Sequence, residues 1–299
     1  GDRPMPTLAQ LLAPLAATEG YNPTPIEGVG VYRSNETTGR EPLCYSQGII
    51  IMAQGTKRVF LDNQVYEYNP DNYLVLTLPT PADCEAITLP DGPLLSLVMD
   101  LDLSALHELV RIFDECRQTG GANAPSLNAH TLYVAPATRA FNASVVRLAE
   151  ALNDPLAAKA LGPGLKKELL LHALRGPNGA SLVDLVRHNT QLSRLEPVLK
   201  HVHTHFSEPL DVEQLAALAN MSPASFHRNF RQVAAQSPIQ YIKRIRLTRA
   251  RELLVDQGVK VSQAASLVGY ESASQFSREF KRFYGQPPQT VAIALPSTA

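Results

Sequence analysis

Apolar positions recur at helical spacing in two short stretches of the C-terminal third, and each stretch is followed by a break and a second helical pattern. In the first stretch one face collects the apolar residues Val212, Leu215, Ala216 and Ala219. Residues 220–221 interrupt the periodicity, and the Ser222-Pro223 step is typical of a helix N-terminus, because serine caps free N–H groups and proline lacks one. The pattern predicts a helix, a tight turn and a second helix with Phe226 and Phe230 turned inward.

The same pattern returns further along the chain. Its apolar face is formed by Val261, Ala264, Ala265 and Val268. Gly269 supplies the turn, and Ser272 is the expected N-cap of the following helix. We expect the phenylalanines of that helix to face the core: Phe276, Phe280 and Phe283. The sequence therefore predicts two helix-turn-helix units in tandem.

A connecting helix is predicted between these units, over Pro238–Asp256. Its apolar residues recur at roughly helical period: Ile242, Ile245, Ala250, Leu253 and Leu254. At about 1.5 Å per residue such a helix spans roughly 28 Å, close to the ~34 Å between successive major-groove faces on one side of DNA. The second helices of both units can therefore dock on the same side of a duplex.

Short β-rich runs separated by turn residues fill the chain between Gly28 and Met99. They are Gly30–Arg33, Ile49–Ala53, Lys57–Leu61, Gln64–Tyr68, Tyr73–Leu78, Cys84–Leu89 and Leu94–Met99. Such spacing predicts a small antiparallel sandwich or barrel. Helical spacing follows in Ala105–Cys116, Thr138–Leu152, Gly164–Leu174 and Leu195–Phe206, and Gln118–Pro125 is expected to be a loop.

The two second helices leave small, polar and basic residues on the faces that their phenylalanines do not use. On the first these are Ala224, Ser225, His227, Arg228 and Arg231, and on the second Ala273, Ser274, Gln275, Ser277, Arg278 and Lys281. Arg228 and Arg278 are the strongest candidates for DNA contact, because the guanidinium fork suits both guanine edges and phosphate. The alternative for each arginine is a structural ion pair on the helix surface.

Charge is divided unevenly along the chain, although its formal sum is only −1. Residues 193–299 carry 13 Lys/Arg and 8 Asp/Glu, a net +5, whereas residues 1–192 carry 14 and 20, a net −6. The basic end suits phosphate binding with counterion release. No apolar run approaches the ~20 residues of a membrane span and no signal-peptide pattern is seen, so we expect a soluble cytoplasmic protein without a membrane partner.

The C-terminal residues resemble the DNA-binding domain of the AraC/XylS transcriptional regulators, over roughly residues 195–291. The resemblance rests on four segments: Leu215–Ala219, Ser222–Phe230, Ile242–Ala250 and Gly269–Pro288. It implies that bases are contacted from Ala224, Ser225, His227, Arg228, Ala273, Ser274, Gln275, Ser277 and Arg278. Promoter DNA is the expected partner, and RNA polymerase is a further candidate.

The front half resembles the cupin-type N-terminal domain of one AraC/XylS subgroup, through the Gln-Gly-x-Lys-x-Val-x-Leu run at Gln54–Leu61 and the tyrosine pattern at Tyr66–Val75. This resemblance implies a small-molecule sensor, generally in a dimer. An apolar or aldehyde-like effector could lie against Tyr32, Ile50, Met52, Phe60, Tyr66, Tyr68 and Leu76. The alternatives are that these side chains fill the core, and that the chain is a ligand-independent factor whose front half is only a dimerisation or interaction module.

The predicted fold is therefore α+β, with a cupin-like β-sandwich or barrel followed by an all-α DNA-binding domain. We expect a sensor domain with its following helix over 1–120, a helical linker and dimerisation region over 121–192, and the DNA-binding domain over 193–299. An apolar stripe of Leu106, Leu109, Val110 and Phe113 either forms a dimer face or packs on the barrel.

An enzyme is the rival class, because many cupins hold a catalytic metal through histidines. None of the eight histidines lies in the predicted barrel, and His201, His203 and His205 lack a suitably spaced carboxylate or cysteine. We therefore predict no metal, no cofactor and no catalytic residue. The three cysteines have no metal spacing. Cys44 and Cys84 lie in the β region, either as ordinary buried residues or as a thiol sensor of oxidants or aldehydes.

Overall fold

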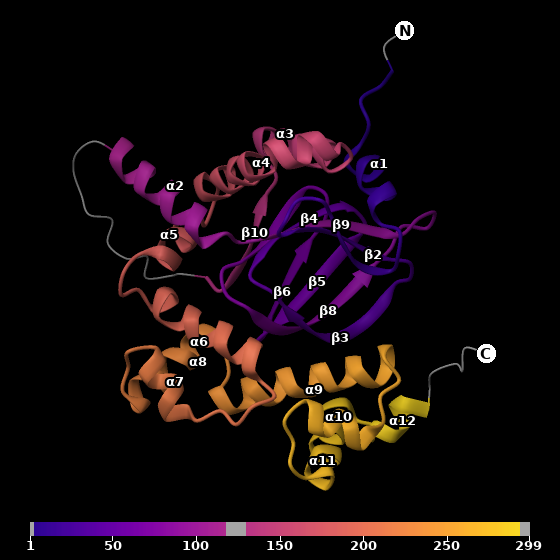
Figure 1. Ribbon diagram of the computed structural model, residues 1–299, viewed down its shortest axis with the longest axis vertical. Helices are drawn as coiled ribbons and strands as arrows, with labels where there is room; N and C mark the ends of the chain where they lie inside the picture. The colour runs from indigo at the N-terminus through magenta and orange to yellow at the C-terminus, as the bar shows by residue number, and fades with distance from the viewer. Residues whose placement is uncertain (1–2, 118–129, 294–299) are drawn as a thin grey trace. The chain divides into compact units, whose positions relative to one another are not determined.

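The computed structural model describes residues 3–117 and 130–293, so the loop predicted at Gln118–Pro125 lies outside the described residues. The chain divides into two compact units (Figure 1). One contains residues 1–41 and 45–193, and the other contains residues 42–44 and 194–299. We call them the β unit and the helical unit.

The β unit is built on two facing sheets. The larger has the strand order β1-β2-β9-β4-β7-β10 and the smaller the order β3-β8-β5-β6. The strands are β1 Gly20–Pro23, β2 Val29–Ser34, β3 Thr38–Tyr45, β4 Gly48–Gln54, β5 Thr56–Leu61, β6 Gln64–Tyr68, β7 Asn72–Leu76, β8 Thr80–Ile87, β9 Leu94–Asp100 and β10 Leu132–Pro136. The two-layer β architecture predicted from the turn spacing is confirmed.

Helices cover the outer face of the larger sheet (Figure 1). The helical segments of this unit are α1 Leu8–Leu12, the 3-10 turn Ala13–Leu15, α2 Leu103–Cys116, α3 Arg139–Leu152, α4 Pro155–Arg175 and α5 Ala180–Val186. The ring of Tyr73 in β7 stacks on Phe141 in α3, with centroids 3.9 Å apart. Tyr73 and its neighbours on that face therefore belong to the sheet–helix core.

Helix α4 begins earlier than the predicted Gly164–Leu174. The Asp154 carboxylate accepts hydrogen bonds from the N–H groups of Leu156 and Ala157, and Pro155 occupies the first turn, so this N-terminus is well capped. The helix continues through Pro163, and Gly162 is buried against Ile26, where an added Cβ would lie 3.2 Å from that side chain.

The apolar stripe of α2 packs inside the β unit. Leu106, Leu109 and Val110 are buried, and the helix contacts α4 and α5. Phe113 is only half-buried, and the Arg117 guanidinium lies 4.9 Å from its ring centroid. The stripe was predicted either to form a dimer face or to pack on the barrel. The structure shows it packed within the β unit, against α4 and α5.

The helical unit contains the two predicted helix-turn-helix pairs. Its helices are α6 Gln191–His205, α7 Val212–Leu218, α8 Pro223–Ala234, α9 Pro238–Asp256, α10 Val261–Leu267, α11 Ala273–Tyr284 and α12 Pro288–Ile293. The connecting helix α9 has the predicted bounds. None of the described helices combines the length and the apolar character that crossing a membrane requires.

One core residue of the second pair was predicted wrongly. Phe276 and Phe280 are fully buried, but Phe283 is 37% exposed. The buried stripe of α11 follows four-residue steps and ends on Tyr284, whose hydroxyl donates to the Leu247 carbonyl at 3.1 Å. Phe283 lies beside this stripe, with its ring edge against Tyr284.

Candidate nucleic-acid interface and sensor site

The first helix-turn-helix pair holds its second helix, α8, by a left-handed turn and an N-cap. Asn220 has φ +54°, and the N–H of Met221 returns to the Ala216 carbonyl at 3.0 Å. The Ser222 hydroxyl accepts from the Ser225 N–H at 3.3 Å, as the Ser-Pro step predicted. Phe226 and Phe230 are buried beneath, so the orientation of α8 is fixed by its own core.

The opposite face of α8 is available to a partner. Ala224, His227, Arg228 and Arg231 are exposed, and Ser225 is half-buried. The Asn229 amide donates to the Ser225 carbonyl at 2.8 Å and to its hydroxyl at 3.2 Å, which fixes Asn229 along the helix. The structure thus brings all the residues predicted to contact DNA from this helix onto one surface.

The second pair repeats this arrangement in α10 and α11. Gly269 has φ +99°, and the N–H of Tyr270 returns to the Ala265 carbonyl at 3.0 Å. The Ser272 hydroxyl accepts from the Gln275 N–H at 3.2 Å. Exposed residues of the outer face are Ala273, Ser274, Gln275, Arg278 and Lys281, while Ser277 is half-buried. We call α8 and α11 the reading helices.

Neither candidate arginine is used in an ion pair. Within residues 3–117 and 130–293, Arg228 and Arg278 each lack a carboxylate partner. Each guanidinium therefore keeps its five N–H donors available for another acceptor.

Glu279 links the second reading helix to the preceding turn and to α9, and the sequence analysis did not identify it. It accepts a hydrogen bond from the Tyr270 hydroxyl and pairs with the Lys243 ammonium of α9 at 3.2 Å. The Gln275 amide also donates to it at 3.4 Å. Burial acts to raise the pKa of Glu279, but the Tyr270 hydrogen bond and Lys243 outweigh it and hold that pKa below its usual value. Its counterpart on α8 is the uncharged Asn229.

Polar contacts from α9 hold α6 and the segment that follows it. Arg246 donates from Nε to the Phe206 carbonyl at 2.7 Å and from Nη2 to the Glu208 carbonyl at 2.9 Å. His203 Nε2 lies 2.7 Å from the Tyr241 hydroxyl, and burial lowers the pKa of this histidine to about 4. His201 and His205 lie with ring centroids 4.5 Å apart. Within the described part of the chain no three His, Cys, Asp or Glu residues gather as a metal site would require.

Six of the seven predicted effector residues face the layer between the two sheets. Strand register and alternation place Tyr32, Ile50, Met52, Tyr66, Tyr68 and Leu76 on the inner faces. Phe60 is the exception: it lies on the outer face of β5, 4.3 Å from the Arg40 guanidinium. The run Val59-Phe60-Leu61 is apolar on both faces, so its pattern did not show that Val59 takes the inner side.

A polar cluster lies within this inner layer. The hydroxyls of Tyr45 and Tyr68 are 3.2 Å apart, and the Cys84 thiol interacts with Tyr45. Lys57 of β5 points to the same side, with its ammonium 4.3 Å from the Tyr32 ring centroid. Burial lowers the pKa of Lys57 and raises that of Cys84, although Lys57 opposes the latter change. Cys84 is therefore a thiol near neutral pH, and Cys44 is half-buried.

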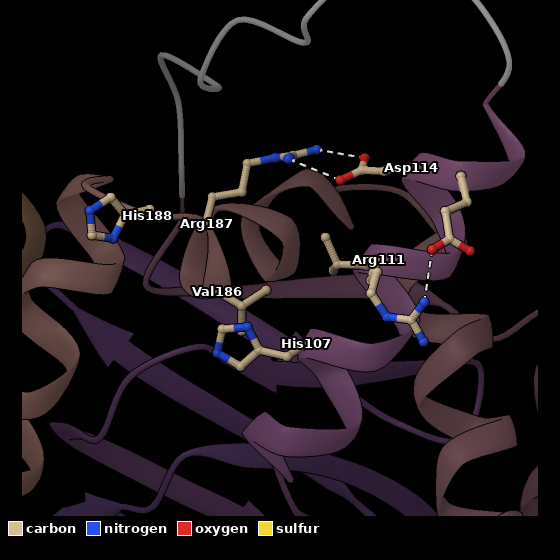
Figure 2. A pocket seen from close by; sticks show the side chains of 8 residues that line it. His107, Arg111, Asp114, Val186, Arg187 and His188 are labelled. Carbon is tan, nitrogen blue, oxygen red and sulfur yellow. Dashed lines mark hydrogen bonds and ion pairs between the residues drawn. The ribbon is translucent and has the colours of Figure 1, made fainter.

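A surface pocket of about 690 Å³ lies between α2 and the C-terminal end of α5 (Figure 2). Its arginines are already paired. Arg187 forms a two-pronged ion pair with Asp114, at 2.9 and 3.1 Å, and Arg111 pairs with Glu115 at 2.8 Å. None of the residues predicted to bind an effector lines this pocket, whose charges compensate one another.

Two family models match the chain. One describes the N-terminus of AraC-type transcriptional regulators and matches residues 25–181, and the other describes a helix-turn-helix domain and matches residues 215–292. The regulator GbdR of Pseudomonas aeruginosa is 30% identical over 100 residues, which are 33% of this chain and 27% of GbdR. The chain thus spans about a quarter of that relative's length.

The fold is similar to that of ToxT from Vibrio cholerae. An apo variant of ToxT superposes with a TM-score of 0.57 and 11% identity, covering 93% of this chain and all of ToxT. Wild-type ToxT bound to an unsaturated fatty acid superposes with a TM-score of 0.54 and 15% identity, covering 91% of this chain and 96% of that protein. At this identity the likeness concerns the fold.

Proposed function

The chain belongs to the AraC-type transcriptional regulators, and we propose that it binds promoter DNA through both reading helices under the control of a small-molecule effector in the β unit. RNA polymerase and a second copy of the chain are the further partners in this proposal.

The observation that carries the DNA-binding part is the repeated outward face of α8 and α11. Each face combines small or polar residues with an arginine that has no carboxylate partner among the described residues. The phenylalanines underneath are buried, so each reading helix presents its polar side from a rigid base. Arginine recognises guanine by two hydrogen bonds in the major groove, and small side chains let the helix approach the base edges. The net charge of +5 over residues 193–299 adds attraction to phosphate.

Effector control is supported by the inner layer of the β unit. Ile50, Met52 and Leu76 provide an apolar wall, and Lys57 and the tyrosines provide polar groups beside it. ToxT has the same fold and was crystallised with an unsaturated fatty acid. A small, largely apolar effector is therefore the class that we propose for this chain.

The test is selection of bound genomic fragments by the purified full-length chain, followed by affinity measurements in a salt series. We expect a site with two short blocks about ten base pairs apart and an affinity that falls steeply with salt. Failure to enrich any sequence, with or without candidate effectors, would contradict the DNA-binding proposal. A site whose affinity ignores every effector would favour the ligand-independent factor.

A further inference from the structure

Lys57 is the most unusual residue of the β unit, because its charged side chain lies between two sheets. Only 5% of the residue is exposed. It shares its side of β5 with Val59, which is fully buried, and the facing residue on β6 is Tyr68. Lysines are almost never buried to this extent without a partner.

The ammonium of Lys57 has no such partner. Among the residues that the structure describes it forms no hydrogen bond and no ion pair, and the Tyr32 ring centroid lies 4.3 Å from its nitrogen. One aromatic face compensates a buried cation only in part.

The groups around Lys57 are polar but uncharged, and a hydroxyl can donate as well as accept. The Tyr45 and Tyr68 hydroxyls are buried, and the Cys84 thiol lies next to Tyr45. A carboxylate accepts hydrogen bonds and donates none, so it complements an ammonium and phenol hydroxyls together. Tyr32 and Tyr66 face the same layer and are only half-buried, so solvent reaches part of it.

We propose that Lys57 anchors the acidic head group of the effector, which is therefore a small molecule with a carboxylate at one end and an apolar body. The apolar body lies along Ile50, Met52 and Leu76. This inference rests on the effector control proposed above and gives that effector its chemical class. Binding restores the charged form of a lysine that burial disfavours, and the ion pair replaces the missing partner.

An aldehyde is the competing chemistry for the same amine. A neutral Lys57 amine would attack the aldehyde carbon, form a C=N bond and release the aldehyde oxygen as water. We favour the carboxylate, because it gives the buried ammonium an anionic partner, whereas an imine forms only from the neutral amine and supplies no anion. The two chemistries differ in whether a covalent bond forms.

The test compares the full-length wild type with Lys57→Met and Lys57→Gln by titration calorimetry. Arg58→Met is the matched control, because Arg58 is the next residue but lies on the outer face with Glu67 and Glu85. The probes are hexanoic, decanoic and oleic acids, their methyl esters, and decanal. Thermal melting first verifies that each variant is folded.

We expect at least one acid to bind the wild type and Arg58→Met at least tenfold more tightly than its ester. Both Lys57 variants should lose at least tenfold in affinity for that acid, about 1.4 kcal/mol, and none for the ester. No acid binding, equal binding of acid and ester, or unchanged acid binding by folded Lys57 variants would each overturn the proposal. So would borohydride trapping of decanal on Lys57 without acid binding.

The DNA measurement separates this inference from the proposed function. If a genomic site is enriched but no acid binds, the assignment of Lys57 fails and DNA binding stands. If an acid binds through Lys57 but no site is enriched in its presence or absence, the DNA-binding proposal fails and the anchor stands.

Discussion

The hydroxyl of Tyr270 donates a hydrogen bond to the carboxylate of Glu279, which joins the turn of the second helix-turn-helix pair to its reading helix. Lys243 extends this link to α9. The first pair has no equivalent acid, because the uncharged Asn229 stands at the corresponding place and donates to the Ser225 carbonyl. The two reading helices are therefore held by different means.

From this difference we expect Glu279→Gln to weaken recognition of the second block, the one assigned to α11, and not of the first. The amide is neutral and cannot serve both Tyr270 and Lys243 as a carboxylate does, so α11 should become less firmly fixed on α9. Discrimination between bases in the second block should fall several-fold, whereas the first block keeps its preference. Competition binding with single-base variants of the selected site measures this, and Glu271→Gln, an exposed neighbouring acid, is the control. Equal weakening of both blocks would contradict the assignment.

Replacing Arg228 or Arg278 with alanine tests how each reading helix contacts DNA. An arginine that reads a base should cost about 1–3 kcal/mol on substitution and relax the preference at one position. An arginine that contacts phosphate should weaken all sequences alike and reduce the salt slope by about one. If neither substitution changed DNA affinity or base preference, the assignment of α8 and α11 to the DNA interface would be wrong.

Burial of His203 should make the helical unit sensitive to acid. The pKa of this histidine is lowered from 6.5 to about 4, so between these values the unfolded chain binds a proton that the folded chain does not. Stability should therefore be intact above pH 6.5 and fall as the pH drops toward 4, by about 1.4 kcal/mol per unit in this window. Urea midpoints at several pH values measure the slope. His203→Gln should flatten it, and the exposed His227→Gln should leave it unchanged.

Gly269 and Gly285 give a matched pair for backbone strain. Both have positive φ, +99° and +76°. A Cβ on Gly285 would meet no atom within 4 Å, whereas one on Gly269 would lie 2.6 Å from the Ser207 carbonyl oxygen. Gly285→Ala should cost about 1 kcal/mol from the backbone conformation alone. Gly269→Ala should cost clearly more, as a lower urea midpoint at the same slope, because the turn must also move away from Ser207.

The helical unit could be predicted closely because its signals are local. The caps at Ser222 and Ser272, the turn at Gly269 and the four-residue phenylalanine spacing all act within a few residues. Strands β1, β3 and β10 were missed for the opposite reason. β10 is defined by its pairing with β7, far away in sequence, and β3 carries the polar run Gly39-Arg40-Glu41 instead of an alternating pattern.

Single residues of the proposed effector site were also missed, because their surroundings depend on strands that are distant in sequence. Lys57 lies in the Gln54–Leu61 motif, but the sequence alone does not predict that it is buried, because charged residues are expected on surfaces. Its spacing from Val59 and Leu61 is the two-residue step of a buried face, and this was the available signal. Only the opposing sheet, which brings Tyr32 over the ammonium, shows that the lysine lies inside.

Helix α9 contacts both helix-turn-helix pairs, since α8, α10, α11 and α12 all pack on it. In the proposed DNA complex, a change at an exposed position of a reading helix alters which base is preferred and leaves the helix framework intact. The distance between the two recognised blocks then depends on the length of α9. Inserting one residue into α9 would rotate one block by about 100° relative to the other. Related regulators that keep the length of α9 should therefore recognise different base sequences. The distance between the two recognised blocks should be the same in all of them.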